Sequence, residues 1–379
     1  MARAGLGSEW DCLYSNDIDS KKGASYVANW GGADFRLGDI ADVTASQLSG
    51  QADLLWASFP CQDLSLAGSG TGLRGDKSST VSNVWRLIRE LTLLQRRPKV
   101  IAFENVCGLI TSRQGNDFRA LTRSFDQAGY WVGAFVVDAK HFVPQSRKRV
   151  FFIGVDKALN VDPALVSTKQ NSKHSPKSLQ DAVDRLPKHL QDKWLWWNFG
   201  APSERSIFLN DILERDSEVQ WDEPNRTQKL LRQMSKTNLT KVNDAIKKNV
   251  RVIGTIFRRT RIEDGIRVVR AEVRFDGIAG CLRTPNGGSS KQTLIIIEKD
   301  HIKTRHLTGR ECVRLMGLPE NYKIPENTNS ALYLAGDGVV VPVVRHISEN
   351  LIQPLLDYNR DSASENQVSS CHLVRTYAA

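Results

Sequence analysis

The sequence predicts an α/β fold, with a mostly parallel sheet covered by helices on both faces and a second, smaller β-rich module. Over residues 1–165, short apolar runs typical of buried strands alternate with segments whose apolar side chains recur at helical spacing. After about residue 156 the chain becomes polar, basic and proline-containing, with weak periodicity. Strands that alternate with helices favour parallel pairing, and 379 residues suffice for one large domain and a smaller one.

The first part of the chain supplies its strands and helices in regular order. Apolar runs predict strands at residues 12–15, 53–57, 100–103, 132–137 and 151–153. Two amphipathic helices are expected between them, at residues 82–96 and 117–128, and the second ends at Gly129.

The later part of the chain predicts fewer regular elements. β-like runs occur at residues 250–257 and 266–273, after three tryptophans at positions 194, 196 and 197. Thr308 and Glu311 have the spacing of a capping box, which predicts a helix through Met316. A last helix is expected through about residue 356, and the polar residues 359–379 are expected to be disordered.

Composition excludes several classes of protein. No segment approaches the roughly 18 unbroken apolar residues of a membrane span, and the first residues lack the pattern of a signal peptide. The six cysteines have no metal-ligand spacing. Reduced thiols, no metal site and a cytoplasmic location are therefore expected.

Positive charge is concentrated in one segment. The formal net charge is +10, and residues 225–274 hold 14 basic and 4 acidic side chains, which accounts for the whole excess. This predicts a surface that faces a polyanion such as nucleic acid. A basic face that is merely solvated is the alternative.

Cys61 is the first candidate for chemistry. The strand at residues 53–57 is followed by Phe59-Pro60, so Cys61 begins a polar, glycine-rich loop beyond the carboxyl end of that strand. Ligands of open α/β sheets bind beyond such strand ends. A small buried side chain is the alternative reading, because free cysteines are often buried.

Further motifs follow the next strands in order, Glu104-Asn105-Val106 and Gln145-x-Arg147-x-Arg149. Together with Pro60-Cys61-Gln62, they resemble the core motifs of the cytosine-C5 DNA methyltransferases of bacterial restriction–modification systems. Residues 305–312 and 336–340 resemble two later motifs of that family. The resemblance covers about residues 1–355, and residues 156–274 match in position only.

The resemblance implies a Rossmann-like, S-adenosylmethionine-dependent methyltransferase fold plus a smaller, irregular β-rich target-recognition domain. Residues 1–165 would form the catalytic and cofactor-binding domain, and residues 166–304 the target-recognition domain. Residues 305–358 would return to the catalytic domain, and residues 359–379 would be a disordered tail.

The implied reaction transfers a methyl group to C5 of a flipped-out cytosine in a specific duplex DNA sequence. Cytosine C5 becomes nucleophilic when a thiolate adds to C6, which would be the role of Cys61. Glu104 would donate a proton toward N3, Arg147 would contact O2, and Arg149 would support the pocket. Without the other motifs, phosphate or solvent contacts are the simpler reading of the two arginines.

The methyl donor would be S-adenosylmethionine. Asp17 would bind its ribose hydroxyls and Ile18 would pack on its adenine. The full set of residues that the resemblance places around the cofactor is Asp17, Ile18, Asp39, Ile40, Pro60, Val81, Asp337 and Val339. Asp337 departs from the family, which usually has Asn there.

The DNA substrate would contact Gln62, Ser65, Asn105 and Gln145. The target-recognition domain would read the major groove, where all base pairs are distinguishable. A monomer that acts on double-stranded DNA is expected, alongside a cognate endonuclease that shares the target site without binding this chain.

The start of the chain departs from the family. The family opens with a strand that ends in a Phe-x-Gly-x-Gly loop, and this strand is expected to be missing, because residues 2–7 read as the end of the helix that follows it. A start codon assigned too far downstream, or a truncated gene, would explain this. Two alternatives therefore stay open: a truncated, catalytically inactive DNA-binding relative, and an RNA cytosine-C5 methyltransferase. The long recognition region favours DNA.

Overall fold

The computed structural model of the chain describes residues 1–59, 80–167, 174–284, 291–364 and 374–378. The chain divides into two units. The large unit holds residues 2–137, 148–201 and 343–379. The small unit holds residues 138–147 and 202–342, together with the first residue.

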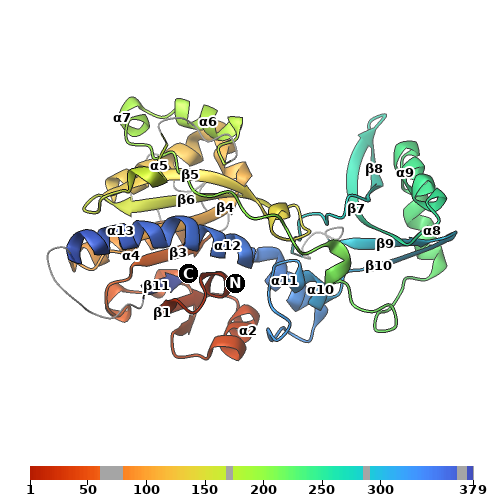
Figure 1. The fold of residues 1–379 in the computed structure, drawn as a ribbon, viewed down its shortest axis with the longest axis horizontal. Helices are drawn as coiled ribbons and strands as arrows, with labels where there is room; N and C mark the ends of the chain where they lie inside the picture. Colours follow the sequence, from red (N-terminus) through yellow and green to blue (C-terminus); the bar gives the residue numbers. More distant parts are fainter. Residues whose placement is uncertain (60–79, 168–173, 285–290, 365–373, 379) are drawn as a thin grey trace. The chain divides into compact units, whose positions relative to one another are not determined.

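The large unit is built on a sheet whose described strands number seven, in the order β2-β1-β11-β3-β4-β6-β5 (Figure 1). β2, β1, β11, β3 and β4 run parallel, and β6 is antiparallel to β4. The strands predicted from apolar runs are confirmed, and β2 and β11 are additional. Their bounds are β1 Trp10–Asp17, β2 Phe35–Leu37, β3 Leu54–Ser58, β4 Val100–Val106, β5 Tyr130–Asp138, β6 Lys148–Asp156 and β11 Val374–Ala378.

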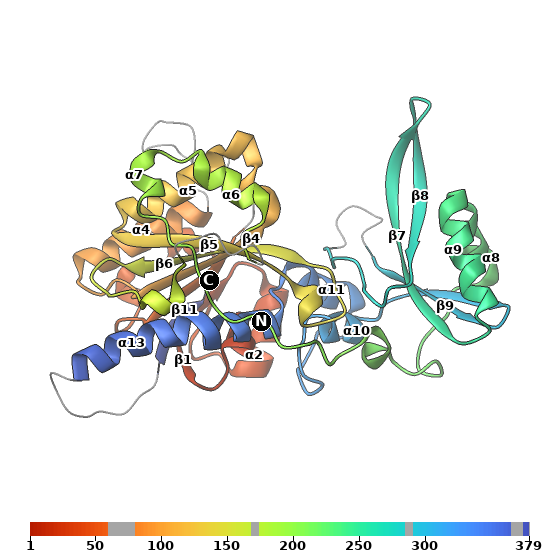
Figure 2. The same cartoon turned by 45° about the horizontal axis from the view of Figure 1, so that its top comes forward.

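Helices lie on both sides of this sheet (Figures 1 and 2). No helix in the described part of the chain is both long and apolar enough to cross a membrane. The helices of the large unit are α1 Ala2–Leu6, α2 Ser20–Trp30, α4 Thr80–Leu93, α5 Asn116–Gln127, α6 Lys177–Asp184, α7 Lys188–Gln191, α12 Val341–Ile347, the π-helical turn Ser348–Ile352 and α13 Gln353–Ser364. Short 3₁₀ turns in the large unit are Ile40–Asp42, Ala45–Gln47, Cys107–Ile110, Ser112–Gly115 and Pro163–Leu165.

The core of the large unit packs α4 and α5 against the sheet. α5 buries Phe118, Leu121 and Phe125, which recur at helical spacing on one face. Phe125 and Phe103 of β4 meet Trp85 of α4 edge-on, with ring centroids 4.9 and 5.3 Å from the Trp85 ring. Burying each large apolar side chain contributes roughly 2–3 kcal/mol, so this aromatic group is a main source of the sheet's stability.

The tryptophan-rich segment belongs to the large unit, so the expected domain boundary at residue 166 is wrong. Trp194 and Trp197 are buried, and the Leu195 N–H donates to the Val132 carbonyl of β5 at 3.0 Å. A Cβ added at Gly133 would lie 1.9 Å from the Leu195 carbonyl oxygen, so glycine is required for this close approach. The segment therefore extends the main core, and the small unit takes over at residue 202.

β11 is the largest departure from expectation. It lies in the centre of the sheet between β1 and β3, where the first strand was expected to be missing. The expected disordered tail at residues 359–379 is wrong for residues 359–364, which end α13, and for Val374–Ala378, which form β11. A five-residue strand in a polar stretch has no periodicity that sequence reasoning detects, and it is held by pairing with distant strands.

The small unit contains an antiparallel sheet of four described strands, in the order β10-β9-β7-β8. Its core packs Met234, Val242 and Ala245 against Ile256 and Ala271 of the sheet. The β-like runs predicted around residues 250–273 are thus confirmed. The elements are β7 Val252–Glu263, β8 Ile266–Arg274, β9 Thr293–Glu298, β10 His301–His306, α8 Pro224–Arg232, α9 Lys236–Lys247, α10 Gly309–Arg314 and α11 Thr328–Asp337, with 3₁₀ turns at Ala139–His141 and Leu209–Ile212.

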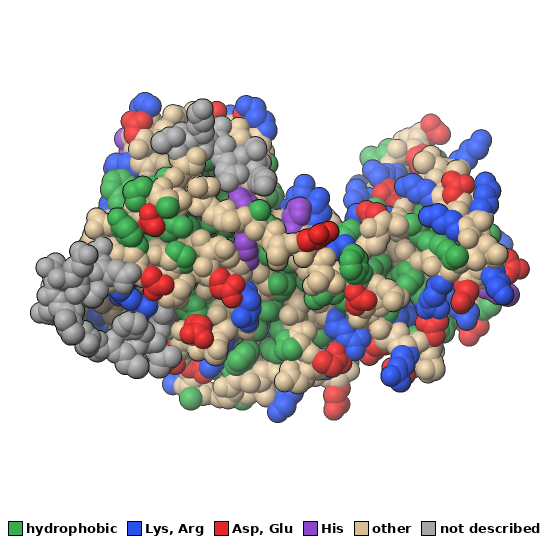
Figure 3. Space-filling model, viewed as in Figure 1, with side chains coloured by type: hydrophobic (Ala, Val, Ile, Leu, Met, Phe, Trp, Pro, Cys, Tyr) green, Lys and Arg blue, Asp and Glu red, His purple; other side chains and the backbone are tan. Residues whose placement is uncertain are grey.

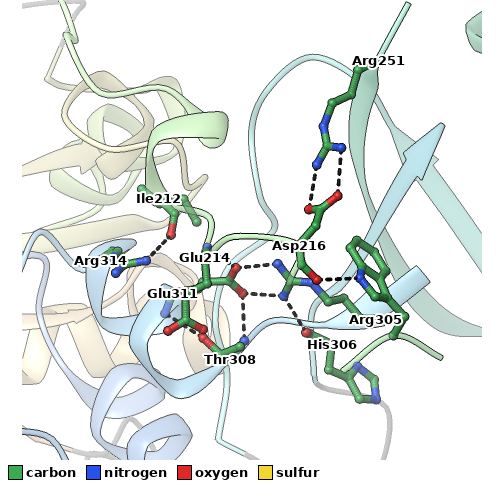
Figure 4. A network of polar contacts seen from close by, with 10 residues as sticks. Ile212, Glu214, Asp216, Arg251, Arg305, His306, Thr308, Glu311 and Arg314 are labelled. Atoms are coloured by element: carbon green, nitrogen blue, oxygen red, sulfur yellow. Dashed lines mark hydrogen bonds and ion pairs between the residues drawn. The ribbon is translucent and has the colours of Figure 1, made fainter. Parts of the chain in front are cut away.

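A buried ion pair joins β10 to α10 in the small unit (Figure 4). Arg305 donates to both carboxylate oxygens of Glu311, at 2.7 and 2.6 Å, and the two side chains are 2% and 0% exposed. Glu311 also accepts from the backbone N–H groups of Thr308 and Glu214, each at 2.9 Å. The Glu311 N–H donates in turn to the Thr308 hydroxyl, so the predicted capping box is confirmed.

Replacing Glu311 by Ala is expected to lower the free energy of unfolding by about 3–5 kcal/mol, because the Arg305 guanidinium would stay buried without its partner. Urea denaturation followed by circular dichroism measures this loss. Glu320→Ala is the matched control, because Glu320 pairs with Arg314 at the surface and its removal should cost at most about 1 kcal/mol. Equal losses for the two variants would contradict this account.

Candidate active site

The candidate site lies at the edge of the large unit's sheet where its parallel strands end. β3 ends at Ser58, and the register places Ser58 opposite Glu104 of β4. β6 runs in the opposite direction, so its first residues lie at this same edge, with Arg149 opposite Val106. Open α/β sheets bind their ligands at this edge.

Glu104 and Arg149 form an ion pair at the edge. The Arg149 Nε lies 3.0 Å from a Glu104 carboxylate oxygen, and the side chains are 15% and 8% exposed. A carboxylate so enclosed has lost most of its hydration and is stabilised by a nearby guanidinium. The pair therefore places a partly dehydrated acid and a fixed positive charge side by side.

Asn105 fixes the chain that leads into the Cys61 segment. Its side-chain amide donates to the Phe59 carbonyl at 2.9 Å, and its carbonyl oxygen accepts from the Val106 N–H at 2.8 Å. Phe59 also packs edge-on against Phe103, with ring centroids 5.4 Å apart. Asn105 is buried, so the expectation that it contacts DNA does not fit this geometry, and it acts as a positioning residue.

Four predicted site residues, Pro60, Cys61, Gln62 and Ser65, lie outside the described residues. The chain enters their segment directly from Phe59, beside the Glu104–Arg149 pair. Cys61 follows the end of β3 by three residues, and this sequence position is what relates it to the edge of the sheet where β3 ends.

Arg147 is buried in the small unit rather than open to a substrate. Its guanidinium donates to the carbonyls of Leu282, Gly336 and Gly338, at 2.9, 2.8 and 2.7 Å. These bonds give no support to the expected contact of Arg147 with the cytosine O2, which stays a prediction. The arginine beside Glu104 is Arg149. The two arginines are only two residues apart in the sequence, which does not reveal which of them lies beside Glu104.

Gln145 is likewise a structural residue. It is fully buried in the small unit, its amide donates to the Leu315 carbonyl at 2.9 Å, and its carbonyl accepts from the Leu282 N–H at 3.1 Å. This burial gives no support to the expected DNA contact of Gln145, which stays a prediction. With Arg147, it clamps the backbone around residue 282.

The ends of β1 and β2 bring together three of the predicted cofactor residues. The Gly38 N–H donates to the Asp17 carbonyl at 3.1 Å, which ties the segment of Asp39 to the end of β1. Ile18 is 70% exposed, which is unusual for so apolar a side chain. Two carboxylates beside an exposed apolar surface suit the hydroxyls and the base of a nucleoside, so the residues present fit an adenosine-containing group.

The remaining predicted cofactor residues are placed differently. Ile40 and Val81 are buried in the main core, below the surface of the sheet edge. Asp337 and Val339 lie at and after the end of α11 in the small unit, where Asp337 is exposed and Val339 is buried.

Two described cysteines are unsuited to nucleophilic chemistry. Burial raises the pKa of the Cys12 thiol to about 11, and burial also raises the pKa of Cys312. Both thiols are therefore protonated at neutral pH, and a thiolate is the reactive form. Cys281 lies 3.5 Å from Arg147 in the structural clamp described above.

Residues 1–353 match the protein family described as C-5 cytosine-specific DNA methylase. The chain belongs to this family. The Type II methyltransferase M.HhaI of Haemophilus parahaemolyticus is 27% identical to it over 352 residues, covering 93% of this chain and 90% of that protein. The Type II methyltransferase M.Bsp6I of Bacillus sp. is 24% identical to it over 354 residues, covering 92% of this chain and 93% of that protein.

A solved structure supports the same fold. The superposition on the S. pombe Dnmt2 methyltransferase covers 91% of this chain and 91% of that one, with a TM-score of 0.55 and 17% sequence identity. The fold is that of an S-adenosylmethionine-dependent methyltransferase. Family membership makes this chain a DNA (cytosine-5-)-methyltransferase with S-adenosylmethionine as its methyl donor.

Arg147→Met is expected to lower the free energy of unfolding of this methyltransferase by about 3 kcal/mol or more, because three carbonyls, two of them buried, lose their donor. The matched control combines Glu104→Gln with Arg149→Met, which removes the edge ion pair without leaving a buried charge. The control should lose methylation but less than about 1 kcal/mol of stability. Urea denaturation of both variants, with a methyl-transfer assay, measures the difference; parent-like stability of Arg147→Met would contradict the clamp.

Proposed function

We propose that this methyltransferase attacks C6 of a flipped-out cytosine with Cys61, in a specific sequence of duplex DNA. The observation that supports the proposal is the Glu104–Arg149 pair beside the strand that leads to Cys61. When bound, S-adenosylmethionine supplies a methyl group activated by a positive sulfur. The protein's task is therefore to make C5 of the cytosine nucleophilic.

Each side chain has one step in this scheme. The Cys61 thiolate forms a bond to C6, and the electron pair of the C5–C6 double bond moves toward C5, N3 and O2. Glu104 stabilises N3 through a hydrogen bond, and Arg149 takes the O2 contact that sequence reasoning gave to Arg147. After C5 has taken the methyl group, a water molecule accepts its proton, the C–H electron pair restores the C5–C6 double bond, and the thiolate leaves C6. The low exposure of both side chains strengthens these electrostatic contacts.

The small unit is proposed to bind the duplex. Lys, Arg and acidic side chains are scattered over the visible face of the part of this unit that holds β7 to β10 with α8 and α9 (Figure 3). β7 and β8 form a hairpin that turns at Asp264-Gly265, where both residues have positive φ, as two-residue hairpin turns favour.

The two faces of this hairpin differ in how their charges are engaged. On one face, Arg261 pairs with Glu272 and Arg270 pairs with Glu263. On the other face lie Arg258 and Arg267, whose strand partners are Ala271 and Ile262, and these two arginines form no ion pair within the described residues. Arg267 is exposed and Arg258 is half-buried, and guanidinium groups without an acidic partner suit the phosphates of DNA.

We further propose that the protein works as a monomer in the bacterial cytoplasm, where its DNA substrate is found. A cognate endonuclease would act on the same target site without binding this chain. The Type II names of the relatives support a restriction–modification role.

Cys61→Ser is expected to reduce methylation below about a thousandth of the parent rate, because the covalent step is lost. DNA affinity should remain near that of the parent, since the thiol contributes little to phosphate binding. Transfer of tritiated methyl groups to DNA measures the rate, and gel shifts measure affinity. Cys107→Ala, which changes a half-buried cysteine outside the scheme, is the control. Residual turnover of Cys61→Ser above that level would exclude a thiolate mechanism.

The double variant Arg258→Ala with Arg267→Ala is expected to weaken DNA binding and to lower the slope of log affinity against log salt by about 1.8, for two lost phosphate contacts. Fluorescence anisotropy at several salt concentrations measures the slope. Lys177→Ala with Lys188→Ala is matched in charge and changes two exposed lysines of the large unit. The same slope change in both double variants would show that only net charge matters.

A further inference from the structure

β11 occupies the centre of the large unit's sheet although it comes last in sequence among the described strands. Thr376 lies opposite Cys12 of β1 on one side and opposite Leu54 of β3 on the other. Without β11, the sheet would separate into the pair β2-β1 and the group β3-β4-β6-β5, each with an unpaired edge. The continuity of the sheet therefore depends on these five residues.

The direction in which the chain crosses the sheet changes at β11. From β1 the chain moves outward to β2 on one side, and from β3 it moves outward to β4 on the other side. Ligands of open α/β sheets bind at such a reversal, beyond the carboxyl ends of the strands. Because β11 is parallel to β1 and β3, its carboxyl end at Ala378 lies at the same edge as Asp17 and Ser58.

The start of the chain lies close to this strand. α1 leads directly into β1, and β1 pairs with β11. The family match covers residues 1–353, so β11 at Val374–Ala378 lies outside it.

We propose that Val374–Ala378 supply the central strand of the cofactor-binding sheet, so that a β-α-β unit is assembled from the two ends of the chain: β11, α1 and β1. The carboxyl end of β11 then forms part of the S-adenosylmethionine site, between the end of β1 and the end of β3. This second part rests on the proposed function. Affinity for the cofactor would thus depend on residues beyond those that define the family.

Hydrogen exchange on the intact protein tests the strand directly. The backbone amides of residues 375–378 are expected to exchange at least about 100-fold more slowly than in a free peptide of the same sequence, because a central strand is bonded on both sides. Exchange at the rate of the free peptide would overturn the proposal. This readout needs neither cofactor nor DNA, so it is independent of the proposed function.

Two substitutions at Thr376 test the link to the cofactor. Thr376→Pro removes a ladder N–H from a central strand, and it is expected to lower the thermal midpoint and to weaken S-adenosylmethionine binding at least about tenfold by calorimetry. Valine suits a strand as well as threonine does, so Thr376→Val should have the thermal midpoint and the S-adenosylmethionine affinity of the parent. Equal binding by the Pro variant, the Val variant and the parent would overturn the cofactor part of the proposal.

A rearranged chain gives a test that does not depend on loss of function. In it, residues 365–379 are placed before Ala2 through a Gly-Ser linker of about six residues, and the chain ends at Ser364. It is expected to unfold at a midpoint near that of the parent and to bind S-adenosylmethionine within about threefold of the parent affinity. A midpoint no higher than that of residues 1–364 alone would overturn the proposal. A parent that folds but binds no cofactor would contradict the proposed function instead.

Discussion

The antiparallel pairing of β6 with β4 is the constraint on which the candidate site depends. It brings the first residues of β6 to the edge where β4 ends, and so places Arg149 against Glu104. A parallel β6 would begin at the opposite edge, about 27 Å away for a strand of nine residues. The pairing thus determines which arginine of the motif meets the acid, and it leaves Arg147 to the backbone clamp of the small unit.

Several buried polar residues stabilise the backbone, among them Asn105 and Gln145, which the sequence predicted to contact DNA. Asn105 and Gln145 are buried, and each uses both ends of its amide on main-chain partners. Glu311 accepts two backbone N–H groups and a bidentate arginine in the same way. A buried polar side chain left without partners is costly, so such residues fit only one arrangement of the surrounding loops. In this structure they hold the backbone of the segments around them.

The sequence predicted the elements that have a local signal. β3 and β4 appear as apolar runs because both faces of a central parallel strand are buried, and the capping box at Thr308 is a local pattern. β2, with three residues, and β11, with five, have no such signal and exist through pairing with distant strands. For the site, the sequence named both Glu104 and Arg149, but their pairing, which excludes Arg147, follows from the register of β6. Trp194 and Trp197 were assigned to the wrong domain because their packing partners lie far away in the sequence.

The central claim is that this chain methylates cytosine C5 in DNA, and methylation sequencing tests it most directly. The chain would be expressed in a bacterial host without DNA methylation, and the host genome would be read for 5-methylcytosine. The account predicts methylated cytosines in one short sequence context, and none in the same host that expresses Cys61→Ser. An unmethylated genome in the presence of folded, cofactor-binding protein would contradict it.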